Sequence, residues 1–446
     1  MRRGRTINNK PIITIKTMLI LDTYLAQRER DGKPIRVGLV GAGFAGRGFA
    51  LQLLTRPVGM RLVAIANRTL SFAEQAYRDA GAPRVEEVKS VAELSATIRN
   101  GVPAITADPT LLTDSDHIDV IVEATGEVEF GAGVILRAIE HKKDVILLNA
   151  ELDGTLGPIL KAYADRAGVV YTQADGDQPA VMMNLHRYVQ SIGFKPVMAG
   201  NIKSLLDHRR TPETQKKWAD EHFQRPKMVT SFADGTKISF ENATVANATG
   251  FRVGKRGMYG PRCASVNDTP KLFPMEQLMN GGLVDYILGA EPSFGVFVLG
   301  HSDHPIKQRY MQVYKMGDGP LYTFYTPYHL SPLETPLTVA RVAGFRDAAL
   351  APKGGLVCEV ITIAKRDLKK GEALDGIGGF TCYGTMENAD VAARERLLPM
   401  GLSEGCVLQR DLPMDAALTY DDVILPAGRL ADKLRAEQDK LFPRTP

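Results

Sequence analysis

A glycine-rich turn between a short apolar strand and an apolar helix constrains this chain more than any other feature. Residues 35–54 read IRVGLVGAGFAGRGFALQLL. Gly41 permits a tight turn, Gly43 lets a pyrophosphate approach the backbone, and Gly46 lets the helix pack on the strand. The free N–H groups at the helix start can bind phosphate. We predict a dinucleotide site, and a glycine turn without a ligand is the alternative. The expected cofactor contacts here are Gly41, Gly43, Phe44, Ala45 and Gly46.

The segment after the second predicted strand, residues 60–66, indicates which nicotinamide cofactor binds. NAD enzymes usually place Asp or Glu there against the ribose 2′-hydroxyl, whereas this chain has Asn67, Arg68 and Thr69. These residues include no carboxylate to repel a 2′-phosphate, and a guanidinium can bind one. We therefore expect all three to contact the cofactor and NADPH to be preferred over NADH. The alternative is that Arg68 is a solvated strand-end residue.

Alternation of strands and helices continues to about residue 172 and predicts a doubly wound parallel sheet. Strands are expected at 119–124 and 144–148. Because the carboxyl ends of such strands face the ligand crevice, we expect Thr125, Gly126 and Asn149 beside the nicotinamide and Glu151 among the catalytic groups. A plain turn at Thr125 and Gly126, or an exposed loop acid at Glu151, is the alternative.

The next segment supplies further candidate catalytic and substrate-binding residues. A polar turn containing Asp177 precedes a predicted helix at 180–192 and a strand at 196–200, which leads to Lys203. An ammonium can polarise a carbonyl that accepts hydride, and guanidinium groups bind phosphate or carboxylate. We therefore predict catalytic roles for Lys203, Asp177 and Asp207 and substrate contacts for Arg209 and Arg210. A turn role for Asp177 and solvated ion pairs for the charged residues are the alternatives.

The middle of the chain predicts an open sheet. Residues 232–248 alternate apolar and polar side chains, with Gly235 in an expected hairpin turn, and residues 254–282 suggest loops over the site. A strand at 296–299 precedes His301, Asp303 and His304. Alternation would place His301 and Asp303 on one side and His304 on the other, which disfavours a metal site there.

These patterns define an α/β chain with three domains. We expect a Rossmann nucleotide-binding domain at 18–155, to which a helix within 335–350 returns, and an α+β catalytic and dimerisation domain at 156–334. A linker at 351–355 precedes a small β-rich domain at 355–446, which ends in a helix at 427–441.

Composition excludes several classes of protein. The 446 residues are 44% hydrophobic and 24% charged, with a net charge of +4 that is not concentrated in one segment, so neither disorder nor nucleic-acid binding is expected. Four cysteines form no CxxC pair, and no apolar run reaches the roughly 18 residues of a membrane span. We expect a cytoplasmic protein without membrane partners, and residues 1–17 to be a tag or a mistaken upstream start.

The nucleotide-domain motifs resemble those of homoserine dehydrogenases. They are GAGFAG, the NRT after the second strand, EATG and LLNAELDG. The resemblance departs from that family at Ala150, where homoserine dehydrogenases carry lysine.

The remaining motifs resemble SAF-domain-containing oxidoreductases, and within them the DXR-like reductoisomerases. They include ADGDQP, AGNIKSLLDHRRTPETQ, SFADGTK, YTPYHLSPLETPL and, near the end, AKRDLKKGEAL and ALTYDDVILPAG. The resemblance implies a dimeric cytoplasmic enzyme of isoprenoid precursor synthesis. Such an enzyme converts 1-deoxy-D-xylulose 5-phosphate to 2-C-methyl-D-erythritol 4-phosphate with NADPH. Its rearrangement step needs a carboxylate, Glu151 or Asp177, and an electrophile, either Lys203 or Mg²⁺ or Mn²⁺ on ligands that are not assigned.

Two other functions remain open. One is an NADP-dependent dehydrogenase or oxidoisomerase of a short sugar acid or a homoserine-like substrate. The other is a non-catalytic protein that binds NADP(H) or a carbohydrate.

Overall fold

The nucleotide domain is built on a parallel sheet, as the glycine turn predicts. The structure, a computed structural model, describes residues 20–55 and 58–443, so the segment 1–17 lies outside the described residues. The sheet has the strand order β3-β4-β2-β1-β5-β6-β7. Its strands are β1 (Ile35–Val40), β2 (Met60–Ala66), β3 (Glu86–Glu87), β4 (Ala104–Thr106), β5 (Val120–Glu123), β6 (Asp144–Leu147) and β7 (Tyr171–Gln173). This order, with β1 at the reversal point, is that of a doubly wound fold.

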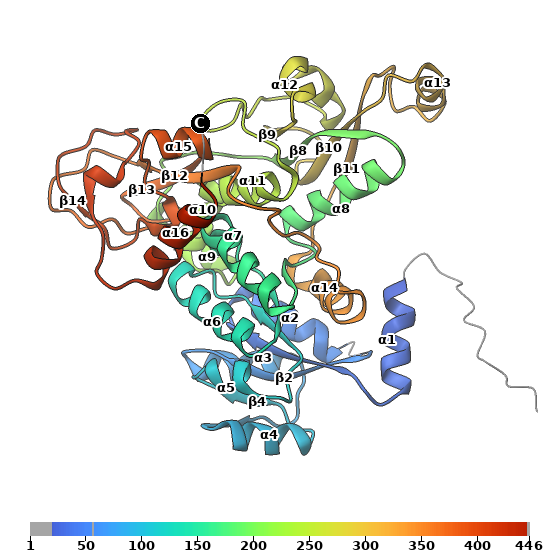
Figure 1. Ribbon diagram of the computed structural model, residues 1–446, viewed down its shortest axis with the longest axis vertical. Helices are drawn as coiled ribbons and strands as arrows, with labels where there is room; N and C mark the ends of the chain where they lie inside the picture. Colours follow the sequence, from blue (N-terminus) through green and yellow to red (C-terminus); the bar gives the residue numbers. More distant parts are fainter. Residues whose placement is uncertain (1–19, 56–57, 444–446) are drawn as a thin grey trace, which may run out of the picture.

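Helices cover this sheet, and one of them comes from far along the chain (Figure 1). The local helices are α1 (Ile20–Arg30), α2 (Phe44–Thr55), α3 (Leu70–Asp79), α4 (Val91–Arg99), α5 (Thr110–Asp114), α6 (Val128–Glu140) and α7 (Ala150–Ala167). Helix α14 (Ser331–Phe345) packs against α2 and buries Val339, Ala340 and Val342 in the same core as Phe49. It begins earlier than the helix predicted within 335–350, since Pro332 suits the first helical turn.

The central domain contains a four-stranded sheet in the order β11-β10-β8-β9. Its strands are β8 (Lys195–Lys203), β9 (Leu283–Leu288), β10 (Gly295–His301) and β11 (Leu321–Thr326). Its helices are α8 (Gln178–Ser191), α9 (Pro212–Glu221), α10 (Pro226–Ala233), α11 (Thr236–Thr249), α12 (Met275–Met279) and α13 (Pro305–Val313), with a 3₁₀ turn η1 (Val266–Lys271). Strand β8 is longer than predicted and ends at Lys203.

The prediction of a hairpin at 232–248 is wrong, because this segment forms helix α11. Residues 236–248 are all buried, whether polar or apolar. A helix buried on every side has no amphipathic stripe, so its sequence lacks the 3.6-residue periodicity that would reveal it. Gly235, expected in a hairpin turn, adopts a left-handed φ of 93° between α10 and α11.

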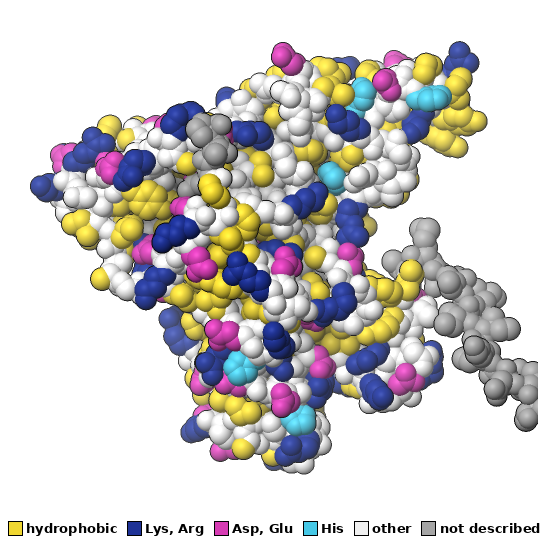
Figure 2. Space-filling model, in the orientation of Figure 1, with side chains coloured by type: hydrophobic (Ala, Val, Ile, Leu, Met, Phe, Trp, Pro, Cys, Tyr) yellow, Lys and Arg dark blue, Asp and Glu magenta, His cyan; other side chains and the backbone are white. Residues whose placement is uncertain are grey.

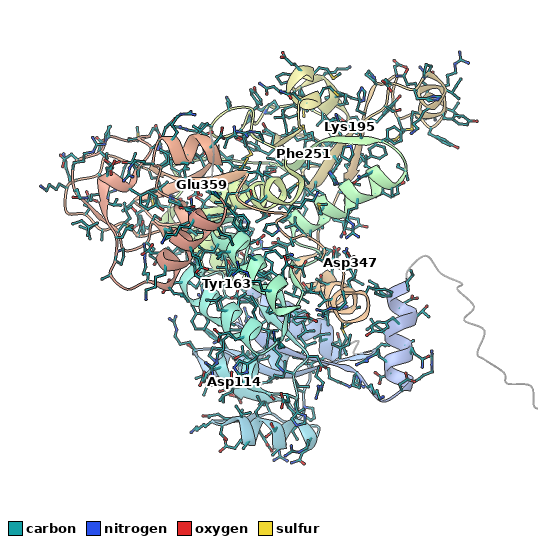
Figure 3. All side chains as sticks on the ribbon, viewed as in Figure 1. Asp114, Tyr163, Lys195, Phe251, Asp347 and Glu359 are labelled. Carbon is teal, nitrogen blue, oxygen red and sulfur yellow. The ribbon has the colours of Figure 1, made fainter. Side chains whose placement is uncertain are left out.

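The C-terminal domain consists of short strands and turns that pack on the other two domains. Its elements are β12 (Cys358–Ala364), β13 (Cys382–Asn388), α15 (Ala389–Arg394), η2 (Met400–Leu402), β14 (Val407–Leu408), η3 (Tyr420–Asp422), β15 (Val423–Ile424) and α16 (Leu430–Leu441). Helix α16 lies against α6 and α7 of the nucleotide domain (Figure 1). Glu359, on the side of this domain that faces the others (Figure 3), bonds at 2.5 Å to Arg435 of α16, and both side chains are buried.

The surface agrees with the charge pattern of the sequence. Figure 2 shows Lys and Arg side chains interspersed with Asp and Glu over the visible face. Within residues 20–55 and 58–443, no helix is long and apolar enough to cross a membrane.

The buried pair between α16 and β12 generates a stability prediction. Arg435→Leu removes the guanidinium that faces buried Glu359 and should lower the free energy of unfolding by about 3–5 kcal/mol. Urea unfolding measures the change. Combining Arg435→Leu with Glu359→Gln should restore part of the lost free energy of unfolding. Arg396→Leu, which breaks an exposed pair with Asp421, serves as the control and should leave the free energy of unfolding nearly unchanged. An equal loss in both arginine variants would contradict the assignment.

Candidate functional site

The glycine turn has the close backbone approach that a dinucleotide site requires. Gly41 has a φ of 102°, and a Cβ there would lie 2.8 Å from the carbonyl oxygen of Ala124. A Cβ at Gly46 would lie 2.0 Å from the carbonyl oxygen of Gly41, whereas a Cβ at Gly43 would meet nothing within 4 Å. The turn is therefore tight on its inner side and open at Gly43, where α2 begins with Phe44 and Ala45. The residues present fit a bound pyrophosphate.

Asn67 links the end of β2 to this turn. Its Oδ1 accepts a hydrogen bond from the Ala42 amide at 3.0 Å, and its Nδ2 donates to the Thr69 carbonyl at 2.7 Å. Arg68 and Thr69 are exposed beside it. The strand end thus presents a guanidinium and a hydroxyl but no carboxylate.

The ends of β5 and β6 are joined by a buried carboxylate. Glu123 accepts from the Thr125 amide at 2.8 Å and from Asn149 Nδ2 at 2.8 Å, and burial raises its pKa. Asn149 also caps α7 by accepting from the Leu152 amide. Gly126, with a φ of 74°, lies next to Met228 of α10. These predicted cofactor contacts therefore lie where the central domain meets the sheet edge.

Two lysine–carboxylate pairs meet at this junction. Lys203, at the end of β8, lies with its Nζ 3.6 Å from Glu241 Oε2. Lys237 Nζ lies 3.2 Å from Oε1 of Glu151, in the first turn of α7. Lys237 and Glu241 are one helical turn apart on α11. We call Glu151, Lys203, Lys237 and Glu241 the paired cluster.

Neutral polar side chains surround the paired cluster. Asn201 Nδ2 donates to Glu241 Oε2 at 3.2 Å and also bonds to Gln178, while Asn242 donates to Asn201. One end of the Gln178 amide lies 3.0 Å from both Lys203 Nζ and His329 Nε2. His329 stacks on Phe294 with ring centroids 4.4 Å apart. Burial lowers the pKa of His329, against the charge of Asp177.

The paired cluster holds one group that can give or take a proton near neutral pH. Burial raises the pKa of Glu241 to about 7, although Lys203 and Lys237 lower it. Burial acts to lower the pKa of Lys237, but Glu151 and the neighbouring carboxylates raise it further, so it lies above the ordinary value. Lys237 is therefore a fixed positive charge, and Glu241 is suited to general acid–base chemistry.

Asp177 serves both as a helix cap and as a member of the surroundings of this cluster. It is the N-cap of α8, and its Oδ1 accepts from the Gln178 amide at 3.2 Å. Its charge acts on Lys237, Glu241 and His329. The structure thus brings predicted residues Glu151, Asp177 and Lys203 together.

The other predicted side chains lie apart from the paired cluster. Asp207 accepts from Arg210 Nε at 2.9 Å, and Arg209 bonds at 2.6 Å to Asp415 of the C-terminal domain. Among the described residues, none of these three predicted side chains bonds to a member of the paired cluster. Their roles stay predictions.

Three members of the site were missed by sequence reasoning. Lys237 and Glu241 have i, i+4 spacing, a signal that is visible only once the segment is recognised as a helix. His329 lies in a loop and gives no periodic signal.

No metal centre is evident in the described part of the chain. Its His, Cys, Asp and Glu side chains form no group of three or more that could hold an ion. His304 instead caps α13 by accepting from the Ile306 amide at 3.2 Å.

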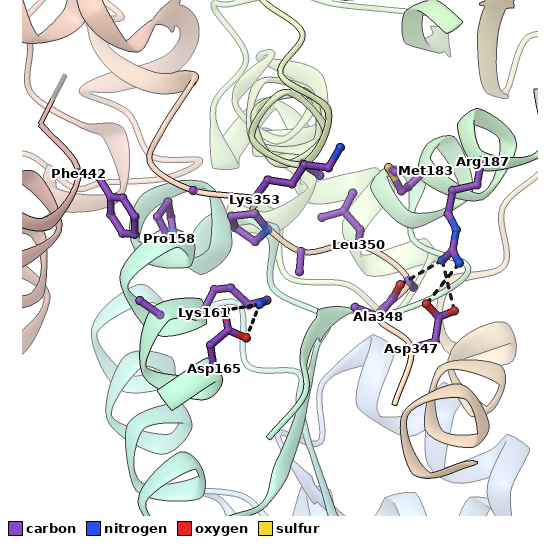
Figure 4. A pocket seen from close by; sticks show the side chains of 16 residues that line it. Pro158, Lys161, Asp165, Met183, Arg187, Asp347, Ala348, Leu350, Lys353 and Phe442 are labelled. Atoms are coloured by element: carbon purple, nitrogen blue, oxygen red, sulfur yellow. Dashed lines mark hydrogen bonds and ion pairs between the residues drawn. The ribbon is translucent and has the colours of Figure 1, made fainter. Parts of the chain in front are cut away.

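A cavity of about 580 Å³ lies elsewhere, between α7, α8 and the linker after α14 (Figure 4). It is lined by the ion pairs Lys161–Asp165 and Arg187–Asp347 and by Phe442. It contains no member of the paired cluster.

The raised pKa of Glu241 predicts a pH dependence of stability. The folded state holds the Glu241 proton more tightly than the unfolded state does. The contribution of Glu241 to the free energy of unfolding is therefore full below about pH 4.5 and is lost as the pH rises through about 7. Between pH 4.5 and 8 the wild type should lose free energy of unfolding on the order of 3 kcal/mol from this group, and Glu241→Gln should not show that loss. Urea unfolding at several pH values measures it, and the exposed Glu213→Gln is the control. Parallel stability curves for wild type and Glu241→Gln would refute the assignment.

Family comparisons match the two larger domains separately. Residues 41–171 match "Homoserine dehydrogenase, NAD binding domain", and residues 176–335 match "Oxidoreductase DRL, catalytic domain". A 1-deoxy-D-xylulose 5-phosphate reductoisomerase of Bacillus pumilus is 30% identical over 133 residues, which are 30% of this chain and 33% of that protein. The match thus spans about a third of the curated relative.

Two dehydrogenases are among the solved structures that resemble this chain in part. A probable dehydrogenase from Thermotoga maritima has 14% identity and a TM-score of 0.41, covering 71% of this chain and 91% of that one. A homoserine dehydrogenase from Thiobacillus denitrificans has 16% identity and a TM-score of 0.37, and the match covers 76% of this chain and 84% of that one. Together with the glycine turn and the parallel sheet, the two domain matches identify the chain as an NAD(P)-dependent oxidoreductase with a homoserine dehydrogenase-like nucleotide domain.

Proposed function

We propose that the chain is an NADPH-dependent reductoisomerase that converts 1-deoxy-D-xylulose 5-phosphate to 2-C-methyl-D-erythritol 4-phosphate. The observation that carries the proposal is the paired cluster at the carboxyl edge of the nucleotide sheet. The DRL-type match and the partial similarity to a Bacillus pumilus reductoisomerase support the choice of reaction.

The paired cluster supplies the groups that such a rearrangement needs. A substrate hydroxyl must lose a proton while a carbonyl is polarised. Glu241, with its pKa near 7, accepts the proton, and Lys203 donates to the carbonyl oxygen. Lys237 pairs with Glu151 beside the sheet edge and adds a positive charge where negative charge develops. NADPH, when bound along the glycine turn, supplies the hydride that reduces the rearranged aldehyde.

His329 and Asp177 flank the cluster from two different loops. The carbonyl of Gly176, the residue before Asp177, lies 3.2 Å from His329 Nδ1. These two side chains are positioned to hold substrate hydroxyls. The metal requirement and the homodimer expected from the sequence stay predictions.

One observation favours a second candidate, an NADP-dependent dehydrogenase or oxidoisomerase of a short sugar acid. Arg209 and Arg210, the guanidinium groups expected to bind a phosphate, are paired with Asp415 and Asp207. A sugar acid needs no phosphate site, because its carboxylate can pair with a lysine of the cluster.

Turnover by a Lys203 variant tests the proposed reaction. Wild type should oxidise NADPH with 1-deoxy-D-xylulose 5-phosphate and Mg²⁺ or Mn²⁺ and form methylerythritol phosphate. Lys203→Ala should lower kcat by about 100-fold or more, because a group that stabilises the transition state is lost. Its affinity for NADPH, measured by fluorescence titration, should remain. Lys216→Ala is the control, since Lys216 pairs with Asp220 on an exposed helix face.

Two outcomes would contradict this proposal in different ways. If wild type binds NADPH but oxidises it only with a sugar acid, the second candidate replaces the first. If Lys203→Ala turns over at the wild-type rate, Lys203 has no catalytic role.

Cofactor preference is tested at Arg68. Arg68→Ala should raise the KM for NADPH about tenfold, since a charge-assisted bond to the 2′-phosphate is lost, and should leave the KM for NADH unchanged. Arg78→Ala, on the exposed face of α3, is the matched control. Equal changes in the KM for NADPH and the KM for NADH would show that Arg68 does not bind the 2′-phosphate.

A further inference from the structure

A buried lysine of the C-terminal domain bonds to segments that adjoin the paired cluster. Lys365 follows β12, and its side chain is 3% exposed. Its Nζ lies 2.9 Å from Asp234 Oδ2, 2.8 Å from the Arg210 carbonyl and 2.7 Å from the Gly379 carbonyl. An ammonium has three protons, so all of its donors are used.

Two of these three acceptors hold segments that carry the cluster. Asp234 ends α10, and its Oδ1 accepts from the Thr236 amide at 2.9 Å, which fixes the start of α11. Lys237 is the next residue along that helix, and Glu241 is one turn further. The carbonyl of Arg210 belongs to the loop that follows Lys203 and β8. The Lys365 ammonium therefore links the start of α11, which carries Lys237 and Glu241, to the loop that follows Lys203.

Further contacts from the C-terminal domain converge on the same helix start. The Gly384 amide of β13 donates to Thr236 Oγ1 at 2.8 Å. Tyr383 stacks on His208 with ring centroids 4.3 Å apart, and His208 Nδ1 lies 2.6 Å from the Asp234 carbonyl. These contacts come from two neighbouring residues of β13 and reach the residues on either side of the Lys365–Asp234 pair along α10 and α11.

The chemistry of the pair argues that it does more than stabilise the fold. Both charges are almost fully buried, and such a pair often stabilises no better than apolar side chains of the same size. It does fix geometry, because each donor requires its acceptor at one distance and direction. Lys237 and Glu241 must face Glu151 and Lys203 within fractions of an ångström for proton transfer.

We propose that Lys365 is a positioning residue for the catalytic centre, and that the C-terminal domain is thereby part of the catalytic unit. Through Asp234 it sets the position of Lys237 and Glu241 relative to Glu151 and Lys203. The proposal rests on the proposed function only in taking the paired cluster as the reaction centre, and it holds for either substrate.

The test uses the full-length protein with three variants. Lys365→Met removes the ammonium. Lys365→Met combined with Asp234→Asn also removes the carboxylate that would be left unpaired, which protects folding. Lys369→Met is the matched control, because Lys369 lies on the same segment but forms an exposed pair with Asp411.

Two readouts separate positioning from stability. The ionisation of Glu241 is followed without substrate, from the carboxylic acid C=O infrared band that Glu241→Gln lacks. Circular dichroism at the same temperature verifies that each variant is folded. Both Lys365 variants should move the midpoint of this band by about half a pH unit or more. With the active substrate, kcat should fall about 100-fold while the affinity for NADPH stays within about twofold.

Several results would overturn the proposal. One is a folded double variant with the wild-type Glu241 midpoint and the wild-type kcat. Another is loss of soluble protein in both Lys365 variants, which would assign the pair to folding alone. Failure of the proposed reductoisomerase reaction is a separate outcome, since the infrared titration needs no substrate.

Discussion

The burial of α11 on every side is the constraint on which the rest of the site depends. A charged side chain on such a helix cannot reach bulk water, so Lys237 and Glu241 must find partners inside the protein. The partners come from elements far apart in the sequence: Glu151 from the nucleotide domain and Lys203 from the central sheet. The helix thereby fixes where the two domains meet. The carboxyl edge of the parallel sheet, where a nicotinamide cofactor reacts, and the polar face of the central domain become one site.

This arrangement is costly for stability, which is why it indicates function. Apolar side chains of similar size would fill the same space without any desolvation of charge. A buried carboxyl with a pKa near 7, such as Glu241, loses its contribution to the free energy of unfolding as the pH rises through that value. Retaining two such pairs within one turn of a single helix is understandable if the charges act on a substrate. The buried Glu359–Arg435 pair differs, because it joins α16 to β12 and includes no member of the paired cluster.

The sequence predicts the nucleotide sheet well and the central segment that carries α11 only in part, for a physical reason. Near the glycine turn, local requirements decide the structure: Gly41 needs a left-handed φ, and Gly46 needs the absence of a Cβ. Such requirements are readable in a short segment. The positions of Lys203 at the end of β8 and of Glu151 in the helix start after β6 follow from the same local logic. Residues 232–248 gave the wrong secondary structure because the burial of a helix by three domains is a tertiary fact. Because the α11 segment was predicted as strand, Lys237 and Glu241 were not recognised as neighbours on one helix face, although their i, i+4 spacing is visible in the sequence.

The three domains converge on α11 in different chemical roles. The nucleotide domain faces it with a carboxylate and the central domain with an ammonium, and each makes one of the two ion pairs of the paired cluster. The C-terminal domain contributes no member of the cluster but holds the start of the helix through Lys365, Thr236 and the stacked ring of Tyr383. A domain that only covered the surface would not need a buried ammonium with all three protons bonded. The third domain therefore belongs to the reacting unit, because the geometry of the first two depends on where it places the helix.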